Sequence, residues 1–226
     1  MKGSLPVGRR SGVLTVVIAL VALLWPAPAT HATPITFEAN LTGANENPAV
    51  PSPGTGHAEV VLDAAAHTIQ INVTFSGLTS NTVAAHIHCC LPSPLSPANV
   101  GVATTVPAFP GFPLGVTAGS YKSAVFDLTQ PLIYNPAFVT LQGGLLPQAE
   151  AAFVAGIQNA ETYLNIHTVN FGGGEIRGIL QAVPESSTLL LAGTALVGLV
   201  GYGERRRRKV AYKPERRHRG ALQNSV

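Results

Sequence analysis

Strict alternation of apolar and polar side chains over residues 68–75 constrains the fold more than any other feature of this chain. Four apolar residues, Ile69, Ile71, Val73 and Phe75, alternate with polar ones, so one side of an extended segment can be buried while the other meets solvent. Glycine and proline separate further short runs of β type, and this pattern predicts an all-β fold, an antiparallel β-sandwich. The other runs lie at residues 35–42, 57–63, 83–88, 100–106, 121–128, 162–168 and 175–182.

One segment breaks the β pattern. Residues 147–159 are rich in alanine, and we predict that they form one short helix. Residues 91–119 hold many prolines and glycines, which is typical of a long irregular connection between strands. Residues 33–183 together have the length of one domain.

The first 32 residues have the pattern of a secretory signal peptide. Lys2, Arg9 and Arg10 precede an apolar run at residues 13–25, and small residues follow that run. A transmembrane anchor is the alternative, but the run is short for a bilayer span. The sequence therefore predicts a signal peptide at residues 1–32 and an exported domain behind it.

The other end of the chain has three successive parts. Val183, Pro184 and Glu185 lead into an apolar stretch at residues 188–202, and basic residues follow at positions 205–209. Basic residues beside an apolar segment stay on the cytoplasmic side of a membrane. This end therefore predicts a C-terminal transmembrane helix with the domain outside, and a buried helix with a solvated basic tail is the alternative.

This ending resembles the PEP-CTERM sorting signal of Gram-negative bacteria, although the motif here reads Pro184-Glu185-Ser186 and lacks the second proline. The resemblance implies a sorting and anchor segment at residues 184–209, followed by a basic tail at residues 210–226. It implies an exosortase-type processing enzyme as a partner. It also implies a protein that is exported and then anchored in the membrane, or displayed on the cell surface or in the extracellular matrix.

The charge of the central domain excludes one class of function. Between residues 33 and 183 the chain has two basic residues, Lys122 and Arg177, against eight acidic ones, a formal charge of −6. A nucleic-acid-binding domain needs a basic stripe on its folded part. We therefore expect no nucleic-acid partner, and the sequence does not name an extracellular one.

Three histidines on two predicted strands form the best candidate site. His86 and His88 share one face of their strand, about 6.5–7 Å apart along it, and His167 belongs to the run at residues 162–168. If the two strands pair, the rings can meet and bind copper or zinc, with ring nitrogens within about 4–5 Å of one another. The alternative is a structural polar network that holds the histidines. The members of that network are Tyr163, Asn165, Glu175 and Arg177.

Cys89 and Cys90 follow His88 directly. An exported chain meets an oxidising compartment, which favours a disulfide between the two. Adjacent cysteines can also pair between chains, stay unpaired, or serve as thiolate metal ligands beside the histidines. The sequence leaves these alternatives open.

Several motifs in order along the chain resemble the CHRD, or chordin-type, domain family over residues 35–181. The two adjacent cysteines and an insertion at residues 109–113 are similar to a bacterial subgroup of that family. The resemblance implies an extracellular all-β domain without an established enzyme activity. The motifs are NLTGANENP at residues 40–48, GTG at 54–56, SGL at 76–78, AHIH at 85–88, YLNIHT at 163–168 and GEIRG at 174–178.

The paired histidines are similar in kind to the copper ligands of copper–zinc superoxide dismutase, whose sandwich is of the immunoglobulin-like type expected here, but the zinc loop has no counterpart. The sequence also has no Gly-x-Ser-x-Gly elbow, no P-loop and no dinucleotide fingerprint. We therefore expect a non-enzymatic, surface-anchored protein with a binding or structural role in the envelope or extracellular matrix. The alternative is a copper- or zinc-binding metalloprotein that uses the three histidines.

Overall fold

The computed structural model describes residues 33–184. The predicted signal peptide at residues 1–32, Glu185 of the sorting motif, the apolar stretch at residues 188–202 and the basic tail lie outside this range. Within the described range, no helix has the length and apolarity that crossing a membrane requires. The signal peptide and the C-terminal membrane segment therefore stay predictions.

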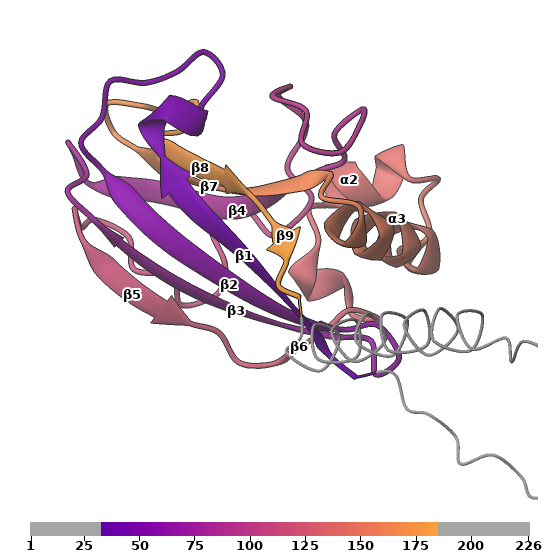
Figure 1. Cartoon of the computed structure of the whole chain (residues 1–226). Helices are drawn as coiled ribbons and strands as arrows, with labels where there is room; N and C mark the ends of the chain where they lie inside the picture. The colour runs from indigo at the N-terminus through magenta and orange to yellow at the C-terminus, as the bar shows by residue number, and fades with distance from the viewer. Residues whose placement is uncertain (1–32, 185–226) are drawn as a thin grey trace, which may run out of the picture.

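The strands of residues 33–184 belong to one antiparallel sheet, which curls into a half-barrel (Figure 1). Their order across the sheet is β4-β7-β8-β1-β2-β3-β5, while β6 pairs with β3 and β9 pairs with β1. The strands are β1 (Ile35–Thr42), β2 (Thr55–Asp63), β3 (Thr68–Ser76), β4 (Thr82–Cys89), β5 (Gly119–Lys122), β6 (Phe126–Asp127), β7 (Thr162–Thr168), β8 (Ile176–Ile179) and β9 (Gln181–Ala182).

The predicted antiparallel β architecture is confirmed, and the structure shows what form it takes. Pairing between β1 and β8 at Thr42 and Arg177 joins the β4-β7-β8 group to the β1-β2-β3 group. The strands therefore lie in one continuous curled sheet rather than in two separate sheets. Phe109 and Phe112, from the long connection between β4 and β5, complete the core inside the curl.

The alternation that predicted β3 is confirmed by its burial. Ile69, Ile71, Val73 and Phe75 are each exposed by 4% or less, and the first three lie opposite equally buried residues of β2. Full burial of one such side chain contributes about 1.5–3 kcal/mol. The hydrophobic face of β3 therefore fixes which side of the sheet becomes the core.

The alanine-rich segment forms the helix α3 (Leu146–Gln158), one residue ahead of the predicted range. Its inner side contributes Ala149, Phe153 and Ile157 to the core, all 0% exposed. A second, shorter helix, α2 (Pro136–Leu141), was not predicted and packs beside α3 (Figure 1). Its sequence signal is Asn135, which caps the helix through Ala137 N, with proline at the first helical position. Two 3-10 turns, η1 (Gly43–Asn45) and η2 (Pro131–Ile133), complete the elements.

Three of the predicted strands are wrong in extent. Residues 100–106 form no strand, because Ala103 N and Thr104 N both bond to Ile87 O of β4, whereas the next amide, of Thr105, bonds to Ile133 O of η2. The run at residues 121–128 is divided between β5 and β6 at Ser123, whose backbone nitrogen donates to Ile71 O while its side-chain oxygen accepts from Ile71 N. The run at residues 175–182 is likewise divided between β8 and β9.

Candidate metal-binding site

Pairing of β4 with β7 brings the predicted histidines onto one face of the sheet. His86 lies opposite Asn165, His88 opposite Tyr163, and His167 opposite Ala84. The residues between them point to the core, where Ile87, Leu164 and Ile166 are 0% exposed. Because side chains alternate along each strand, burial of these apolar residues forces the histidines onto the opposite face.

The three imidazole rings form one compact group. Their centroids are 4.8 Å apart for His86 and His88, 4.5 Å for His86 and His167, and 5.9 Å for His88 and His167. One ring nitrogen from each lies within 4.8 Å of the other two. This separation lies within the range of about 4–5 Å that was expected for three ligands of one ion. The group is nearly enclosed, since the residues are 5%, 8% and 7% exposed.

Backbone carbonyls fix the orientation of two of the rings. His88 Nδ1 lies 2.8 Å from Val100 O, and His167 Nδ1 lies 3.0 Å from Gly172 O. A carbonyl oxygen can only accept, so each Nδ1 carries the hydrogen and each Nε2 keeps its lone pair. Metal-binding histidines are oriented in this way, with the second nitrogen donating to a carbonyl or a carboxylate.

Three other ring nitrogens of this group have no protein partner. His86 Nδ1, His88 Nε2 and His167 Nε2 are buried and form no hydrogen bond within residues 33–184. A buried polar atom without a partner costs about 1–3 kcal/mol. His88 Nε2 and His167 Nε2 have free lone pairs, and His86 Nδ1 is buried beside them, so the group is compatible with a ligand that accepts electron pairs.

Burial also keeps the three rings neutral. It lowers the pKa of His86 to about 3, with the neighbouring histidines adding to the effect. Burial lowers the pKa of His88 to about 4, despite the hydrogen bond to Val100, and it lowers the pKa of His167. At neutral pH all three rings therefore have the lone pairs that a metal ion needs.

A second group of polar side chains lies beside the histidines on the same face. Tyr163 stacks on His88, with ring centroids 4.5 Å apart and planes 9° apart. Asn165 stands between His86 and Arg177 in the strand register. Arg177 Cζ lies 4.6 Å from the centroid of the Tyr163 ring, on which it packs.

Sequence reasoning missed Glu46, which belongs to this group. Its carboxylate approaches Arg177 Nε at 3.8 Å, and both side chains are about 5% exposed. Burial raises the pKa of Glu46 to about 7, although the Arg177 charge works to lower it. Within the described chain, Glu46 Oε1 and Asn165 Oδ1 are also buried without partners. Its position inside the NLTGANENP motif was the available signal.

Glu175 does not contact the histidines, although the alternative of a structural polar network predicted that it would help to hold them. Its carboxylate accepts from Ser52 Oγ at 2.6 Å, from Thr79 N at 2.7 Å and from Thr168 Oγ1 at 2.5 Å. The chain turns at Gly174 (φ 125°) before β8 begins, and the side chain joins loops rather than the histidines. The hydrogen bonds that hold the histidine rings come from backbone carbonyls instead of from Asn165, Glu175 or Arg177.

Replacing Glu175 with glutamine is expected to lower the free energy of unfolding by about 2–4 kcal/mol. The side chain would lose its charge-assisted hydrogen bonds, and its amide nitrogen, itself a donor, would face another donor. Burial raises the pKa of Glu175, but hydrogen bonds from Ser52, Thr168 and Thr79 outweigh it and lower that pKa below 4.5. The stabilisation is therefore present above pH 4.5 and lost as the pH falls through the folded-state value. Urea unfolding at pH 7 measures the change, with Glu38→Gln at an exposed carboxylate as the control. Equal losses in both variants would contradict it.

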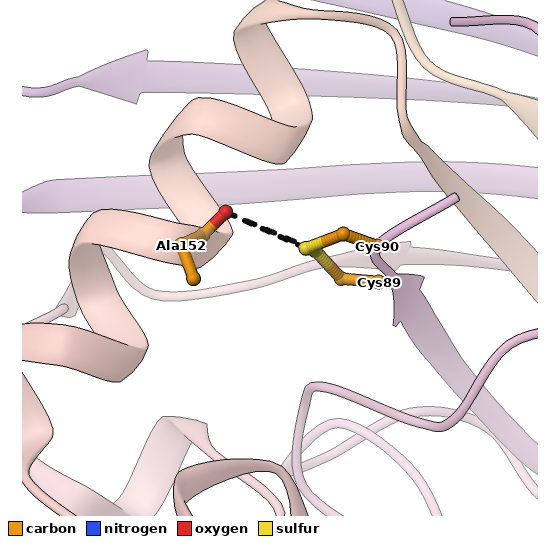
Figure 2. The surroundings of a disulfide bond; sticks show 3 residues. All are labelled: Cys89, Cys90 and Ala152. Atoms are coloured by element: carbon orange, nitrogen blue, oxygen red, sulfur yellow. Dashed lines mark hydrogen bonds between the residues drawn. A yellow bond between two sulfur atoms is a disulfide. The ribbon is translucent and has the colours of Figure 1, made fainter. Parts of the chain in front are cut away.

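The two cysteines form a vicinal disulfide. Figure 2 shows them against α3, where Cys90 Sγ lies 3.5 Å from Ala152 O. A Cβ on Gly156 would come within 2.7 Å of Cys89 Sγ, so the helix needs glycine at this contact. Cys89 shares the core face of β4 with Ile87, opposite to His86 and His88. Among the described residues the metal-compatible group consists of histidines without a cysteine.

Comparison with known proteins gives one family. The CHRD domain family model matches residues 37–180. This match covers more than half of the chain and contains the three histidines, the disulfide and the polar group around Arg177. No curated protein matches the chain, and no solved structure does.

Proposed function

The chain belongs to the CHRD domain family, and from this premise we propose that it is an exported binding protein that holds a copper or zinc ion through His86, His88 and His167. A CHRD domain suggests a binding or structural role outside the cell. The metal ion gives that role a specific chemistry on the polar face of the sheet.

The observation that carries the proposal is the convergence of three neutral, unpartnered ring nitrogens. Three nitrogens bound at 2.0–2.1 Å to a tetrahedral ion are about 3.3 Å apart. The ring nitrogens are now up to 4.8 Å apart. Rotation of the rings that moves each nitrogen by about 1 Å would bring them to the separation that a tetrahedral ion needs. The carbonyls of Val100 and Gly172 already hold two rings in the tautomer that exposes Nε2.

The ligand set favours zinc or copper over harder ions. Imidazole nitrogen suits zinc and copper, whereas calcium and magnesium need oxygen ligands. Three protein ligands leave a fourth position for water or a small molecule. The disulfide removes the adjacent cysteines as competing thiolate ligands.

We place the protein in the envelope of a Gram-negative bacterium. The signal-like segment at residues 1–32, the membrane segment at residues 188–202 and the PEP-CTERM-like ending support this location, as does a disulfide, which persists in oxidising compartments. An exosortase-type enzyme is the proposed processing partner. Cell fractionation tests this placement, and recovery of the protein in the soluble cytoplasmic fraction would refute it.

Metal analysis tests the function directly. The protein is purified from the membrane fraction in detergent, stripped with a chelator, and dialysed against Zn²⁺ or Cu²⁺. We expect one ion per chain in the parent and less than a tenth of that in His86→Ala, because two imidazoles rarely hold an ion. A free ion at 100 times its dissociation constant would also stabilise the folded parent by about 2.7 kcal/mol.

The matched control is His57→Ala, because His57 is an exposed histidine that approaches Glu38 at 3.8 Å. It should bind as much metal as the parent. A folded parent protein that retains no ion after this reconstitution would remove the metal proposal and leave a structural or protein-binding role for the domain.

A further inference from the structure

Arg177 is buried beneath two long connections that cover the polar face. It is 3% exposed, and its donors reach Asn45 O at 2.5 Å, Asn99 Oδ1 at 2.7 Å and Pro97 O at 2.7 Å. Asn45 belongs to the connection between β1 and β2, whereas the other two belong to the connection between β4 and β5. One guanidinium therefore fixes two segments that are about 50 residues apart in sequence.

The first route from Arg177 to the metal site runs along the backbone. Val100 follows Asn99, whose side chain Arg177 holds, and Val100 O accepts from His88 Nδ1 at 2.8 Å. Asn99 also donates to Asn47 O at 2.6 Å, which ties the two connections to each other. The contact of Arg177 with Asn99 thus positions the next carbonyl, Val100 O, which sets the tautomer of His88.

The second route runs through an aromatic ring. Arg177 packs on Tyr163 at 4.6 Å, and Tyr163 stacks nearly parallel on His88 at 4.5 Å. The Tyr163 hydroxyl accepts from Val100 N at 3.3 Å. Both sets of contacts therefore end at His88. Its Nδ1 donates to Val100 O, and its ring face stacks on Tyr163.

We propose that Arg177 is a positioning residue of the metal site, which sets the plane and tautomer of His88 so that Nε2 faces the ion. The inference rests on the proposed function. A planar fork of donors is required, because three acceptors in different directions and a ring face are held at once. Lysine keeps the charge but cannot reproduce that fork. Partners that orient a ligand typically change metal affinity by 10–100-fold.

The test compares Arg177→Lys, Arg177→Met and Tyr163→Phe with Lys122→Met, which removes an exposed cation from β5. Each full-length protein is stripped and titrated with Co²⁺, whose visible absorption reports coordination geometry, and then with Zn²⁺ in competition. Near-ultraviolet circular dichroism of the metal-free proteins confirms folding before each titration.

We expect both Arg177 variants to bind Zn²⁺ about 10–100-fold more weakly and to show an altered Co²⁺ spectrum. Tyr163→Phe keeps the stack and loses two long hydrogen bonds, from Val100 N at 3.3 Å and to Val100 O at 3.4 Å, so its affinity should fall by less than about 10-fold. Lys122→Met should match the parent. If Arg177→Met fails to fold, Arg177→Lys and Tyr163→Phe decide the result.

Two outcomes would overturn the inference, and they are distinguishable. If the parent binds metal and the folded Arg177 variants keep its affinity and spectrum, Arg177 has a structural role alone and the metal site stands. If the folded parent binds neither Co²⁺ nor Zn²⁺, and also retains no Cu²⁺ after reconstitution, both the site and its positioning residue fall.

Discussion

Acidification from pH 6 to pH 4.5 is expected to destabilise the metal-free protein by about 1.4–2.7 kcal/mol per pH unit. Burial lowers the pKa of His86 to about 3 and that of His88 to about 4, and it also lowers the pKa of His167. The unfolded chain therefore binds protons on these residues below pH 6.5 that the folded chain does not bind. Stability consequently rises with pH in this window and is lost as the pH falls.

Glu46 acts in the opposite direction and reduces the slope. Burial raises its pKa to about 7 from 4.5, so the folded chain holds a proton there that the unfolded chain releases. Between pH 4.5 and pH 6 the unfolded chain binds about two to three more protons than the folded chain at the histidines, and about one fewer at Glu46. The net difference of one to two protons gives the expected slope.

Urea unfolding of the chelator-treated protein at a series of pH values measures this effect. His86→Asn should reduce the slope by about one proton, or 1.4 kcal/mol per pH unit, because a neutral side chain does not titrate. A free energy of unfolding that stays constant from pH 7 to pH 5 would show that the three rings are not held neutral.

Replacing Gly178 with alanine is expected to cost about 3 kcal/mol or more. A Cβ at this position of β8 would lie 2.4 Å from Asn40 O and 3.0 Å from Asn40 C, both backbone atoms of β1. Backbone cannot rotate away as a side chain can, so β1 and β8 would have to separate. These strands join the two halves of the sheet.

Thermal and urea unfolding of Gly178→Ala measure that cost. The matched control is Gly101→Ala, because a Cβ on Gly101 meets no atom within 4 Å; we expect a change within about 0.5 kcal/mol. Similar stability in both variants would contradict the close approach of β1 and β8. A Gly178→Ala protein that folds should also bind metal more weakly, since Arg177 precedes the altered position.

The histidine site was predictable because its two strands alternate strongly. Ile87, Leu164 and Ile166 define one buried face, so the polar face carrying His86, His88 and His167 follows from the period of two. The helix at residues 146–158 followed from its alanine-rich composition. Glu46 and α2 were missed, since a lone glutamate in a turn motif and a six-residue helix give weak local signals.

The sequence by itself determined which side chains share a face, because alternation along a strand is a local property of an extended backbone. It also determined that the domain lacks a basic stripe and that its cysteines are neighbours. The tertiary structure decided which strands pair and that Glu175 bonds to Ser52, Thr79 and Thr168. It also decided that Arg177, packed on Tyr163, forms hydrogen bonds with two connections far apart in the sequence. These contacts join residues far apart in the chain, and they depend on how the whole sheet curls and closes its loops rather than on any local preference.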